Sequence, residues 1–387
     1  MKILLTAGIN INQNNACSIN FLRTANSFSY LSNDEIIIFT AEKNSKLFSI
    51  LEKDNIIKKS GYFNKKIPNS INFLINIPKI LNIIRKEDVD IVYIRYNLMS
   101  FLLVFFLRLF SNTFIVTEHH GWVEDELKSN KKNKFISFLF KKLQILDVKM
   151  AHLTRVVVNG IKEKFVNNGV RQEKIVVFQN GTDVASFEDK KNFKKLKSDY
   201  FKIGFIGNLA AWQGVHIALM AMPIILSYRK DIKLIIVGDG PEKKNLELLS
   251  NSLNLKNNVE FCGEVSFENV PLVLSDFDIA IAPFTSERNK SIGLSPIKIR
   301  DYAASGLAII SSDIKGISDY DWLIKVQPDD PEALAKNILH LIANESLRKS
   351  LQEKSKNYAF EHFDVKTIGA AIMSEITKIK NKQLSGK

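Results

Sequence analysis

Lys298 and Asp301 have the residue types and spacing of a pair that could bind a phosphorylated ligand. They lie in the segment SPIKIRDYAASGLAII, residues 295–310, where Ser295 favours a helix N-cap and Pro296 favours the first helical position. A lysine in a first helical turn opposes the helix dipole by roughly 0.3–1 kcal/mol, which is understandable if a diphosphate binds there. Asp301, one turn later, would accept hydrogen bonds from a ribose diol. An exposed i,i+3 salt bridge between the two residues is the alternative.

Two further segments have the pattern of a strand, a glycine turn and a helix. They are FIGNLAAWQGVHIALMAM, with Gly207 and Gly214, and LIIVGDGPEKKNLE, with Pro241 in a first helical turn. Free N–H groups at a helix N-terminus can receive an anion. Ordinary turn chemistry explains both segments equally well.

Two adjacent histidines form a third candidate. His119 and His120 end the run FIVTEHH, which is expected to be a buried strand. An imidazole at the end of a parallel strand lies at the edge where ligands bind. Catalytic and structural roles both fit the residues alone.

The elements that must position these residues are short apolar strands alternating with helix-length segments. Such alternation predicts parallel sheets covered by helices on both faces. The fold class is therefore α/β, with two doubly wound, Rossmann-like domains and an active site in the cleft between them. The predicted strands cover residues 2–7, 35–40, 89–96, 114–119, 155–160, 174–181, 202–208, 233–240, 259–264, 278–284, 307–313 and 322–327.

The chain length also predicts two domains, because 387 residues exceed the size at which one core usually keeps growing. We predict an N-terminal domain over residues 1–185, a charged linker over 186–200 and a C-terminal domain over 201–364. Residues 365–387 are predicted to form a helix that crosses back to the N-terminal domain.

The order of these motifs resembles glycosyltransferase family 4, a large group of retaining glycosyltransferases with the GT-B fold. The resemblance covers most of the chain and is strongest over residues 155–310. Five segments carry it in the family's order: RVVVNGIKEKFVNNGVRQEKIVVFQNGTDVASF, FIGNLAAWQGVHIAL, IIVGDGPEKKNLE, VEFCGEVSFENVPLVLSDFDIAIAPF and SPIKIRDYAASGLAIISSD.

The resemblance implies a nucleotide-sugar donor site in the C-terminal domain. Lys298 and the amides near Ser295 would hold the diphosphate, and Asp301 would hold the ribose. The loop from Gly263 to Val265 would meet the base. The remaining implied donor-site residues are Pro296, Gly207, Asn208, Gly293 and Leu294.

The resemblance also implies an acceptor site in the N-terminal domain, near Gly8 and the EHHG turn. His120, or else His119, would lie beside the reacting sugar and phosphate. No metal and no other cofactor is implied, because protein cations and a helix N-terminus would neutralise the leaving diphosphate.

Three positions depart from the family pattern. Gly293 stands where the family has the first glutamate of a pair, and Asn208 and Gln213 stand where it often has an arginine and a lysine. Two positive charges on the diphosphate are therefore missing. Lys298, Arg288 or Lys290 would have to replace them, or activity would be weak.

The excess of basic residues is explained either by an anionic partner or by a solvated, lysine-rich surface. The chain has 54 basic and 41 acidic residues, a formal net charge of +13. No aromatic or glycine pattern of a nucleic-acid module accompanies the lysines. The segment 131–150 predicts a basic amphipathic helix with Phe135, Phe138, Leu139, Leu143 and Leu146. Such a helix fits an anionic membrane surface; packing against its own sheet, with the lysines outward, is the alternative.

The predicted function is retaining transfer of a sugar from a nucleotide-sugar to a saccharide or lipid-linked glycan, in the assembly of cell-surface polysaccharide or glycolipid. A sugar-nucleotide epimerase and a catalytically weak nucleotide-sugar-binding protein are the alternatives. The first apolar run, MKILLTAG, is too short for a signal peptide. We therefore expect a cytoplasmic location, with possible contact to the inner face of the membrane. Cys17 and Cys262 are expected to be buried and inert.

Overall fold

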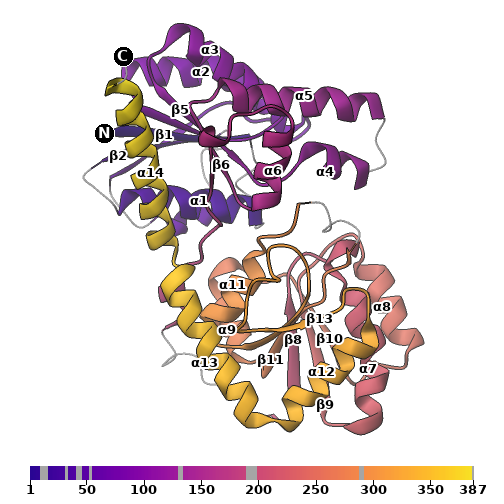
Figure 1. The fold of residues 1–387 in the computed structure, drawn as a ribbon. Helices are drawn as coiled ribbons and strands as arrows, with labels where there is room; N and C mark the ends of the chain where they lie inside the picture. Colours follow the sequence, from indigo (N-terminus) through magenta and orange to yellow (C-terminus); the bar gives the residue numbers. More distant parts are fainter. Residues whose placement is uncertain are drawn as a thin grey trace. The chain divides into compact units, whose positions relative to one another are not determined.

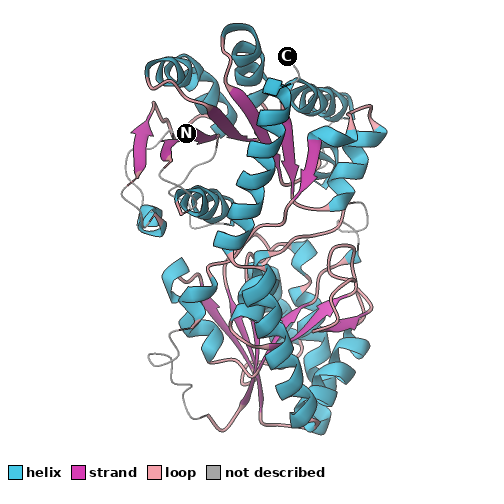
Figure 2. Ribbon diagram, turned by 60° about the vertical axis from the view of Figure 1, so that its left-hand side comes forward, coloured by secondary structure: helices cyan, strands magenta, loops and turns pink. Residues whose placement is uncertain are grey.

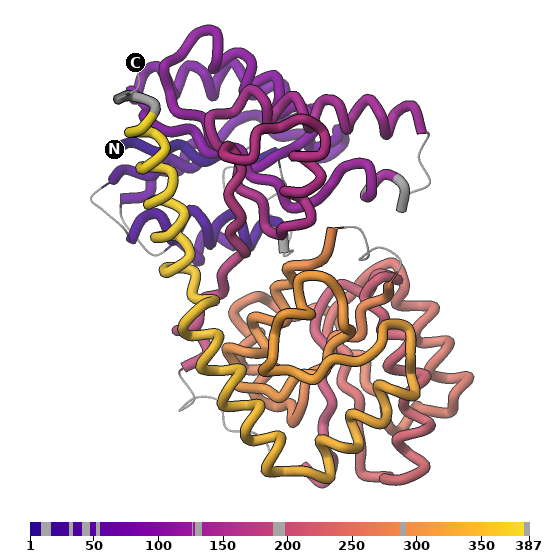
Figure 3. Tube along the Cα trace, in the orientation of Figure 1, coloured from indigo at the N-terminus to yellow at the C-terminus, as the bar shows by residue number. Residues whose placement is uncertain are grey.

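The computed structural model describes residues 1–8, 16–30, 34–40, 46–51, 55–129, 134–188, 198–286 and 292–385. The chain divides into two compact units (Figures 1 and 2). The first unit is Met1–Gly181 together with Val365–Lys387, and the second is Thr182–Asp364. The colour gradient of Figure 3 shows the C-terminal segment belonging to the same unit as the N-terminal strands.

The first unit is built on a parallel sheet of seven strands within the described residues, in the order β3-β2-β1-β4-β5-β6-β7. Most of these strands are continuous Ile, Leu and Val runs, because helices cover both faces of a parallel sheet. The strands are β1 (Lys2–Ala7), β2 (Glu35–Thr40), β3 (Ile56–Ser60), β4 (Ile91–Arg95), β5 (Phe114–His119), β6 (Leu153–Val156) and β7 (Ile175–Val177).

Alternate residues of each strand point to opposite faces of this sheet. Ile3 and Leu5 pack with α1 and α14, whereas Leu4 packs with α2 and α3. Helix α5 packs against α3, and α14 packs against α1 (Figure 1). The helices are α1 (Ala16–Ser29), α2 (Asn69–Lys86), α3 (Ser100–Phe110), α4 (Val123–Ser129), α5 (Lys134–Met150), α6 (Asn159–Asn167) and α14 (Val365–Ser385), with the 3-10 turns η1 (Lys46–Ile50) and η2 (Gln172–Lys174).

The second unit has a parallel sheet of six strands within the described residues, in the order β10-β9-β8-β11-β12-β13. The register pairs Ile279 of β11 with Ile203 of β8 and with Ala308 of β12. The strands are β8 (Phe201–Ile206), β9 (Ile232–Val237), β10 (Val259–Gly263), β11 (Ile279–Ala282), β12 (Ala308–Ser312) and β13 (Ile324–Val326).

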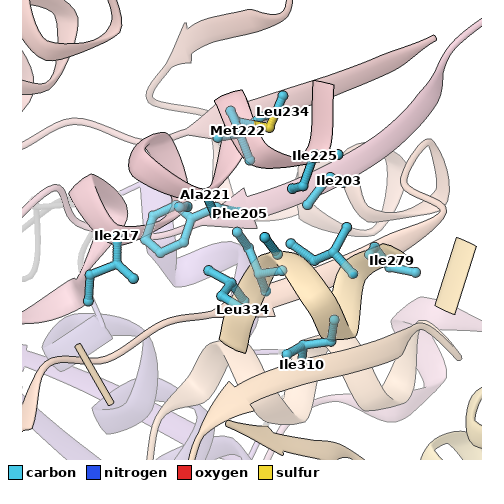
Figure 4. Packing of buried hydrophobic residues seen from close by; sticks show 14 of the residues in the cluster. Ile203, Phe205, Ile217, Ala221, Met222, Ile225, Leu234, Ile279, Ile310 and Leu334 are labelled. Atoms are coloured by element: carbon cyan, nitrogen blue, oxygen red, sulfur yellow. The ribbon is translucent and has the colours of Figure 1, made fainter. Parts of the chain in front are cut away.

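Two apolar layers sandwich this second sheet. On one face Ile203, Ile279 and Ile310 meet α7 and α12, as the side chains of Met222, Ile225 and Leu334 in Figure 4 show. On the other face the small residues of β11 pack against α11 and α13. The helices are α7 (Val215–Tyr228), α8 (Lys243–Ser252), α9 (Val270–Ser275), α11 (Ile297–Ala304), α12 (Pro331–Ala343) and α13 (Glu345–His362), with the 3-10 turns η3 (Val184–Phe187), η4 (Ala211–Gln213) and η5 (Phe267–Asn269).

The architecture matches the predicted pair of Rossmann-like α/β domains, and four local expectations need correction. Strand β3 was not predicted, because its sequence, IIKKS, is polar in its second half. Cys17 and Cys262 are exposed, not buried. Phe187, placed in the predicted linker, is buried in the core of the second unit. The 155–160 run forms its strand earlier, at Leu153–Val156. Much of the predicted linker, residues 189–197, lies outside the described residues.

A helix that spans a bilayer needs about 20 consecutive, predominantly apolar residues. Within the described residues, no helix combines the necessary length with the necessary apolar character.

Candidate active-site residues

The strand order of the second unit reverses between β8 and β11, and the carboxyl ends of these two strands mark the point of reversal. From β8 the chain proceeds to β9 and β10 on one side, and then returns to β11 on the other. Ligands of doubly wound sheets bind where the order reverses in this way. Helix α11 follows β11, so its N-terminus and Lys298 lie at this edge of the sheet.

The start of α11 differs from the expectation. The N-cap is Pro296, without a side-chain capping bond, and the helix begins at Ile297. The prediction that Ser295 caps it is wrong, because Arg300 occupies both Ser295 oxygens. Arg300 Nη1 donates to Ser295 Oγ and Nη2 donates to the Ser295 carbonyl, each at 2.8 Å. Ser295 therefore anchors a buried guanidinium.

Lys298 is a buried lysine whose amino group faces an amide. The residue is only 8% exposed, and its Nζ donates a hydrogen bond to Gln213 Oε1 at 2.7 Å. The ammonium lies 3.6 Å from the centroid of the Phe205 ring and 5.5 Å from that of Phe284. Burial lowers the pKa of Lys298 well below its usual range. A buried ammonium is costly unless an anion or several acceptors compensate it.

Two glycines shape the backbone around this site, and Gly207 lies directly against the ammonium. Gly207 follows β8 with φ +147°, and a Cβ there would lie 2.8 Å from Lys298 Nζ. Gly214 has φ +71°, and a Cβ there would lie 1.7 Å from the Pro283 carbonyl oxygen. Gly214 directly follows the η4 turn that carries Gln213. The tight turn thus holds the Gln213 amide against Lys298.

Asp301 lies one turn along α11 and is also buried. Its Oδ1 accepts a hydrogen bond from Thr182 Oγ1. Thr182 begins the second unit, and its N–H donates to the carbonyl of Phe363 at 2.8 Å. The carboxylate predicted to hold a ribose is therefore tied to the segment where the chain enters this unit.

The remaining predicted donor residues line the same sheet edge or lie close to it. Asn208 is exposed after β8. Gly263 ends β10 with open space where a Cβ would stand, and Val265 packs against the core. Gly293 has φ +79° beside the Lys315 carbonyl, which accepts from the Leu294 N–H at 2.9 Å. Arg288 and Lys290, the proposed substitutes for the missing cations, lie outside the described residues.

In the first unit, the strand order reverses between β1 and β4. Gly8 follows β1, and a Cβ there would lie 2.7 Å from Asn97 Nδ2, after β4. Gly8 also borders a small hollow with Phe39, Phe73 and Asn72. The predicted acceptor-side glycine therefore lies at the reversal point of its own sheet.

A buried charge cluster lies at the ends of the neighbouring strands. Glu118 has no exposed surface, and its Oε1 lies 3.5 Å from Arg155 Nη1 and 3.9 Å from Arg95 Nη1. His120 Nε2 contacts the same oxygen. Burial alone would raise the pKa of Glu118, but His120 and the two guanidinium groups hold it below its usual range. Glu118 is thus a permanent anion at neutral pH.

The ring of His120 is fixed on both sides. Asn180 Nδ2 lies 3.4 Å from His120 Nδ1 and can only donate, so Nδ1 is the acceptor and Nε2 carries the proton toward Glu118. Burial, followed by the charge of Arg95, lowers the pKa of His120 to about 4, although Glu118 opposes the shift. His120 is a neutral imidazole at neutral pH, and part of it reaches solvent.

His119 has a different environment. It is fully buried, it stacks on Tyr96 with ring centroids 4.5 Å apart, and its Nε2 lies 3.2 Å from Asp147 Oδ2. Gln144 Nε2 lies 3.3 Å from its Nδ1. Of the two candidate histidines, His120 is the one with a solvent-facing side chain, and His119 belongs to the interior of the first unit.

Several partners of these residues were not found from the sequence. Gln213 was noted as a departure, but its contact with Lys298 crosses 85 positions, and Thr182 reaches Asp301 across 119. Arg95 and Arg155 occupy strand positions expected to be apolar. A charged residue inside a buried strand was the signal that could have drawn attention to them.

Within the described ranges, no group of three or more His, Cys, Asp or Glu side chains has the arrangement of a metal site.

Two family models match the chain, one in each unit. The model described as "Glycosyltransferase Family 4" matches residues 31–186, and the one described as "Glycosyl transferases group 1" matches residues 200–344. Together they cover the first sheet except β1, the whole second sheet, and the glycine turns and α11 of the second unit. The chain belongs to the family 4, group 1 glycosyltransferases of the GT-B fold.

Similar proteins agree with this assignment. An uncharacterized glycosyltransferase of Methanocaldococcus jannaschii is 28% identical over 75% of this chain and 77% of its own length. The phosphatidyl-myo-inositol mannosyltransferase of Mycolicibacterium smegmatis is 23% identical over 57% of this chain and 55% of its own. The crystal structure of Anabaena HepE in complex with UDP has a TM-score of 0.76 at 18% identity, covering 98% of this chain and 100% of HepE. The epimerase alternative is not favoured by this set.

Proposed function

We propose that this glycosyltransferase transfers a sugar from a nucleotide-sugar donor to an acceptor hydroxyl, with retention of the anomeric configuration. The observation that carries the proposal is the Lys298 ammonium, buried at the reversal point of the second sheet and facing the Gln213 amide at 2.7 Å. A donor diphosphate would supply the missing negative charge. The UDP complex of HepE, a protein of the same fold, supports this donor class.

The proposed step breaks the bond between the sugar C1 and the diphosphate oxygen and forms a bond between C1 and the acceptor oxygen. The acceptor proton passes to the leaving phosphate oxygen. Lys298 and the free N–H groups of the first turn of α11 stabilise the charge that develops on the diphosphate. These groups would perform that role without a metal ion. Asp301 would accept hydrogen bonds from the ribose.

His120 is the proposed polar group beside the reacting sugar. It is neutral at neutral pH because its pKa is lowered to about 4. Glu118 and Asn180 hold its ring in one orientation. A fixed, uncharged imidazole suits hydrogen bonding to a sugar hydroxyl better than it suits permanent charge stabilisation. Gly8 would border the acceptor.

We propose that the acceptor is a saccharide or a lipid-linked glycan of cell-surface polysaccharide or glycolipid assembly, presented at the inner face of the membrane. The phosphatidyl-myo-inositol mannosyltransferase similarity supports a lipid acceptor. The exposed apolar and basic residues of α5 support a membrane location.

The test is incubation with UDP-, GDP-, ADP- and dTDP-sugars, first without an acceptor and then with lipid-linked saccharides. A transferase slowly releases free sugar from its donor and then forms a glycosylated product whose anomeric coupling in NMR matches that of the donor. EDTA is expected to leave the rate unchanged. Product of inverted configuration, or turnover that requires an added divalent metal, would contradict the proposed mechanism.

A catalytically weak nucleotide-sugar-binding protein is the second candidate. It is favoured by Gly293, Asn208 and Gln213, which replace a glutamate and two cations of the family pattern. The same incubation separates the candidates. Saturable donor binding by calorimetry without released sugar or product would favour the binding protein.

A further inference from the structure

Helix α5 has large apolar side chains on its outward side as well as on its inner side. The side chains buried against the first unit are Ser137, Gln144, Ile145, Asp147 and Val148. The outward side also carries large apolar residues: Phe135 is 73% exposed, Phe138 54%, Leu139 46% and Leu146 42%. These four positions recur at three-, four- and seven-residue steps, so they form one stripe along the helix. Helix α5 therefore packs on its own unit with lysines outward, as the alternative expected, and it also exposes an apolar stripe.

Helix α3 adds a second apolar stripe. Phe105, Leu109 and Phe110 of this helix are exposed, Phe110 at 77%. The inner side of α3 packs into the core through Leu103, Val104 and Leu107.

The two stripes belong to one surface of the first unit. Helix α3 connects β4 to β5 and α5 leads into β6, and each new strand is added on the same side of the sheet. Right-handed crossovers therefore place both helices on the same face, and the two helices pack together (Figure 1). We call their outward residues the α3–α5 surface: Phe105, Leu109, Phe110, Phe135, Phe138, Leu139, Lys142, Leu146 and Lys149.

The charge of this surface is of one sign. Lys142 and Lys149 are exposed on the outward side of α5, and the Lys142 ammonium lies 5.3 Å from the Phe138 ring centroid. The only acidic residue within α3 and α5, Asp147, is buried. Lys141 is excluded from the surface because it pairs with Glu124 at 3.2 Å. Cations that flank exposed aromatic rings complement anionic lipid headgroups above an apolar layer.

The surface extends toward the predicted acceptor edge of the unit. Gln144 contacts His119 and the Gly121 carbonyl at the carboxyl end of β5. Phe135 precedes Gln144 by nine positions, so the first half of α5 continues about 13 Å beyond that contact. The most exposed rings of α5 therefore lie on the side of the first unit that carries His120.

We propose that the α3–α5 surface is the site at which this protein docks onto an anionic membrane, with its aromatic rings inserted at the headgroup boundary. The purpose of docking rests on the proposed function, because docking would bring the edge of the first unit that carries His120 to a lipid-linked acceptor. Docking itself is tested by vesicle binding, which requires no turnover. A second copy of the chain is the competing occupant.

The experiment is co-sedimentation of the full chain with phosphatidylcholine vesicles, with or without about one third phosphatidylglycerol. We expect binding to the anionic vesicles that weakens as salt is added. Phe138→Ser/Leu139→Ser and Lys142→Glu/Lys149→Glu should each reduce the partition coefficient about tenfold or more. All four side chains are exposed, so the variants should fold.

Matched control variants lie in the second unit. Leu248→Ser/Leu272→Ser changes two exposed apolar residues, and Lys336→Glu/Lys354→Glu makes the same change of charge at exposed positions. Both should bind vesicles like the wild type. Equal binding to neutral and anionic vesicles, or equal losses in surface and control variants, would overturn the proposal.

Sedimentation velocity without lipid completes the test. A dimer that the Phe138→Ser/Leu139→Ser variant dissociates, together with absent vesicle binding, would assign the surface to self-association and overturn the proposal. UDP binding by calorimetry is measured on the same samples. Retained UDP binding without vesicle binding would reject the membrane surface alone, whereas the reverse result would reject the proposed donor function and leave the docking surface in place.

Discussion

The buried charges of the two units are arranged in opposite ways. In the first unit, Glu118 lies among Arg95, Arg155 and His120, so anion and cations compensate each other within the fold. In the second unit, the Lys298 ammonium meets the oxygen of a neutral amide.

This difference distinguishes a structural charge cluster from a site that awaits a ligand. The first cluster contains its own anion in the free protein, because the Glu118 carboxylate lies between two guanidinium groups, and the same carboxylate orients His120. At the Lys298 site an amide oxygen and two aromatic rings contact the ammonium, and these groups compensate its desolvation less than an anion would. Variants that alter one charge in each region should therefore affect stability and ligand binding in opposite ways.

The largest effect is expected from Glu118→Gln. Removing the anion leaves two buried guanidinium groups without a counter-charge, and breaking a buried ion pair in this way costs about 3–5 kcal/mol. Urea or thermal unfolding followed by circular dichroism measures the loss. Stability equal to the wild type would show that the cluster is not self-compensating.

Lys298→Met should change ligand binding while sparing stability. Losing one charge-assisted hydrogen bond to a diphosphate should weaken UDP affinity roughly 10- to 100-fold, as measured by calorimetry. The melting temperature should stay the same or rise, because a buried cation is replaced by an apolar chain of similar length. Unchanged UDP affinity would remove Lys298 from the donor site.

Lowering the pH should reduce the stability of the first unit, and His120 is the group responsible. Its folded pKa of about 4 lies below the unfolded value of about 6.5, so the unfolded state binds the proton more readily and stability is lost as pH falls between these values. The loss at pH 5 relative to pH 7.5 should be about 2 kcal/mol. Glu118, with its lowered pKa, adds a further loss only below about pH 4.3.

His120→Gln is the control for this pH dependence, because glutamine does not titrate. Denaturant unfolding of the variant should show a flatter stability profile from pH 7.5 to pH 5, by about the same 2 kcal/mol. If wild type and variant have parallel profiles, His120 is not the group that takes up the proton.

Gln213→Glu should make the second region resemble the first. The substitution nearly preserves shape and places a carboxylate against the Lys298 ammonium, which should raise the pKa of Lys298 and compete with a diphosphate. We expect about a tenfold loss of UDP affinity with an unchanged or higher melting temperature. Tighter UDP binding in this variant would contradict the view that Lys298 lacks an anion.

Much of the fold follows from hydropathy patterns alone. The predicted strands at residues 2–7, 35–40 and 114–119 coincide with β1, β2 and β5, because buried parallel strands are uninterrupted apolar runs. Strand β3 escaped prediction because it lies at the edge of the sheet, where Lys58 and Lys59 are tolerated. Helix boundaries were less certain where tertiary contacts decide them, as when Arg300 binds the Ser295 oxygens.

The candidate site was predictable in position but not in its contacts. The helix start at Pro296 and the turn at Gly207 are visible in the sequence, since proline and glycine constrain the backbone locally. The meeting of Lys298 with Gln213 is not visible, because it depends on how the η4 turn folds back over the sheet. Similarly, the sequence shows two equivalent histidines, and only packing distinguishes the buried His119 from the partly exposed His120.

The C-terminal helix has a consequence for biosynthesis. Ile372, Met373 and Ile376 of α14 belong to the same core cluster as Phe21 of α1, so the first unit requires residues that the ribosome adds after the whole second unit. All residues of the second unit, 182–364, are translated before them. Although domains often fold in N- to C-terminal order during synthesis, here the internal unit has its complete core available first. The core that α1 shares with α14 can therefore be completed only after α14 has emerged from the ribosome.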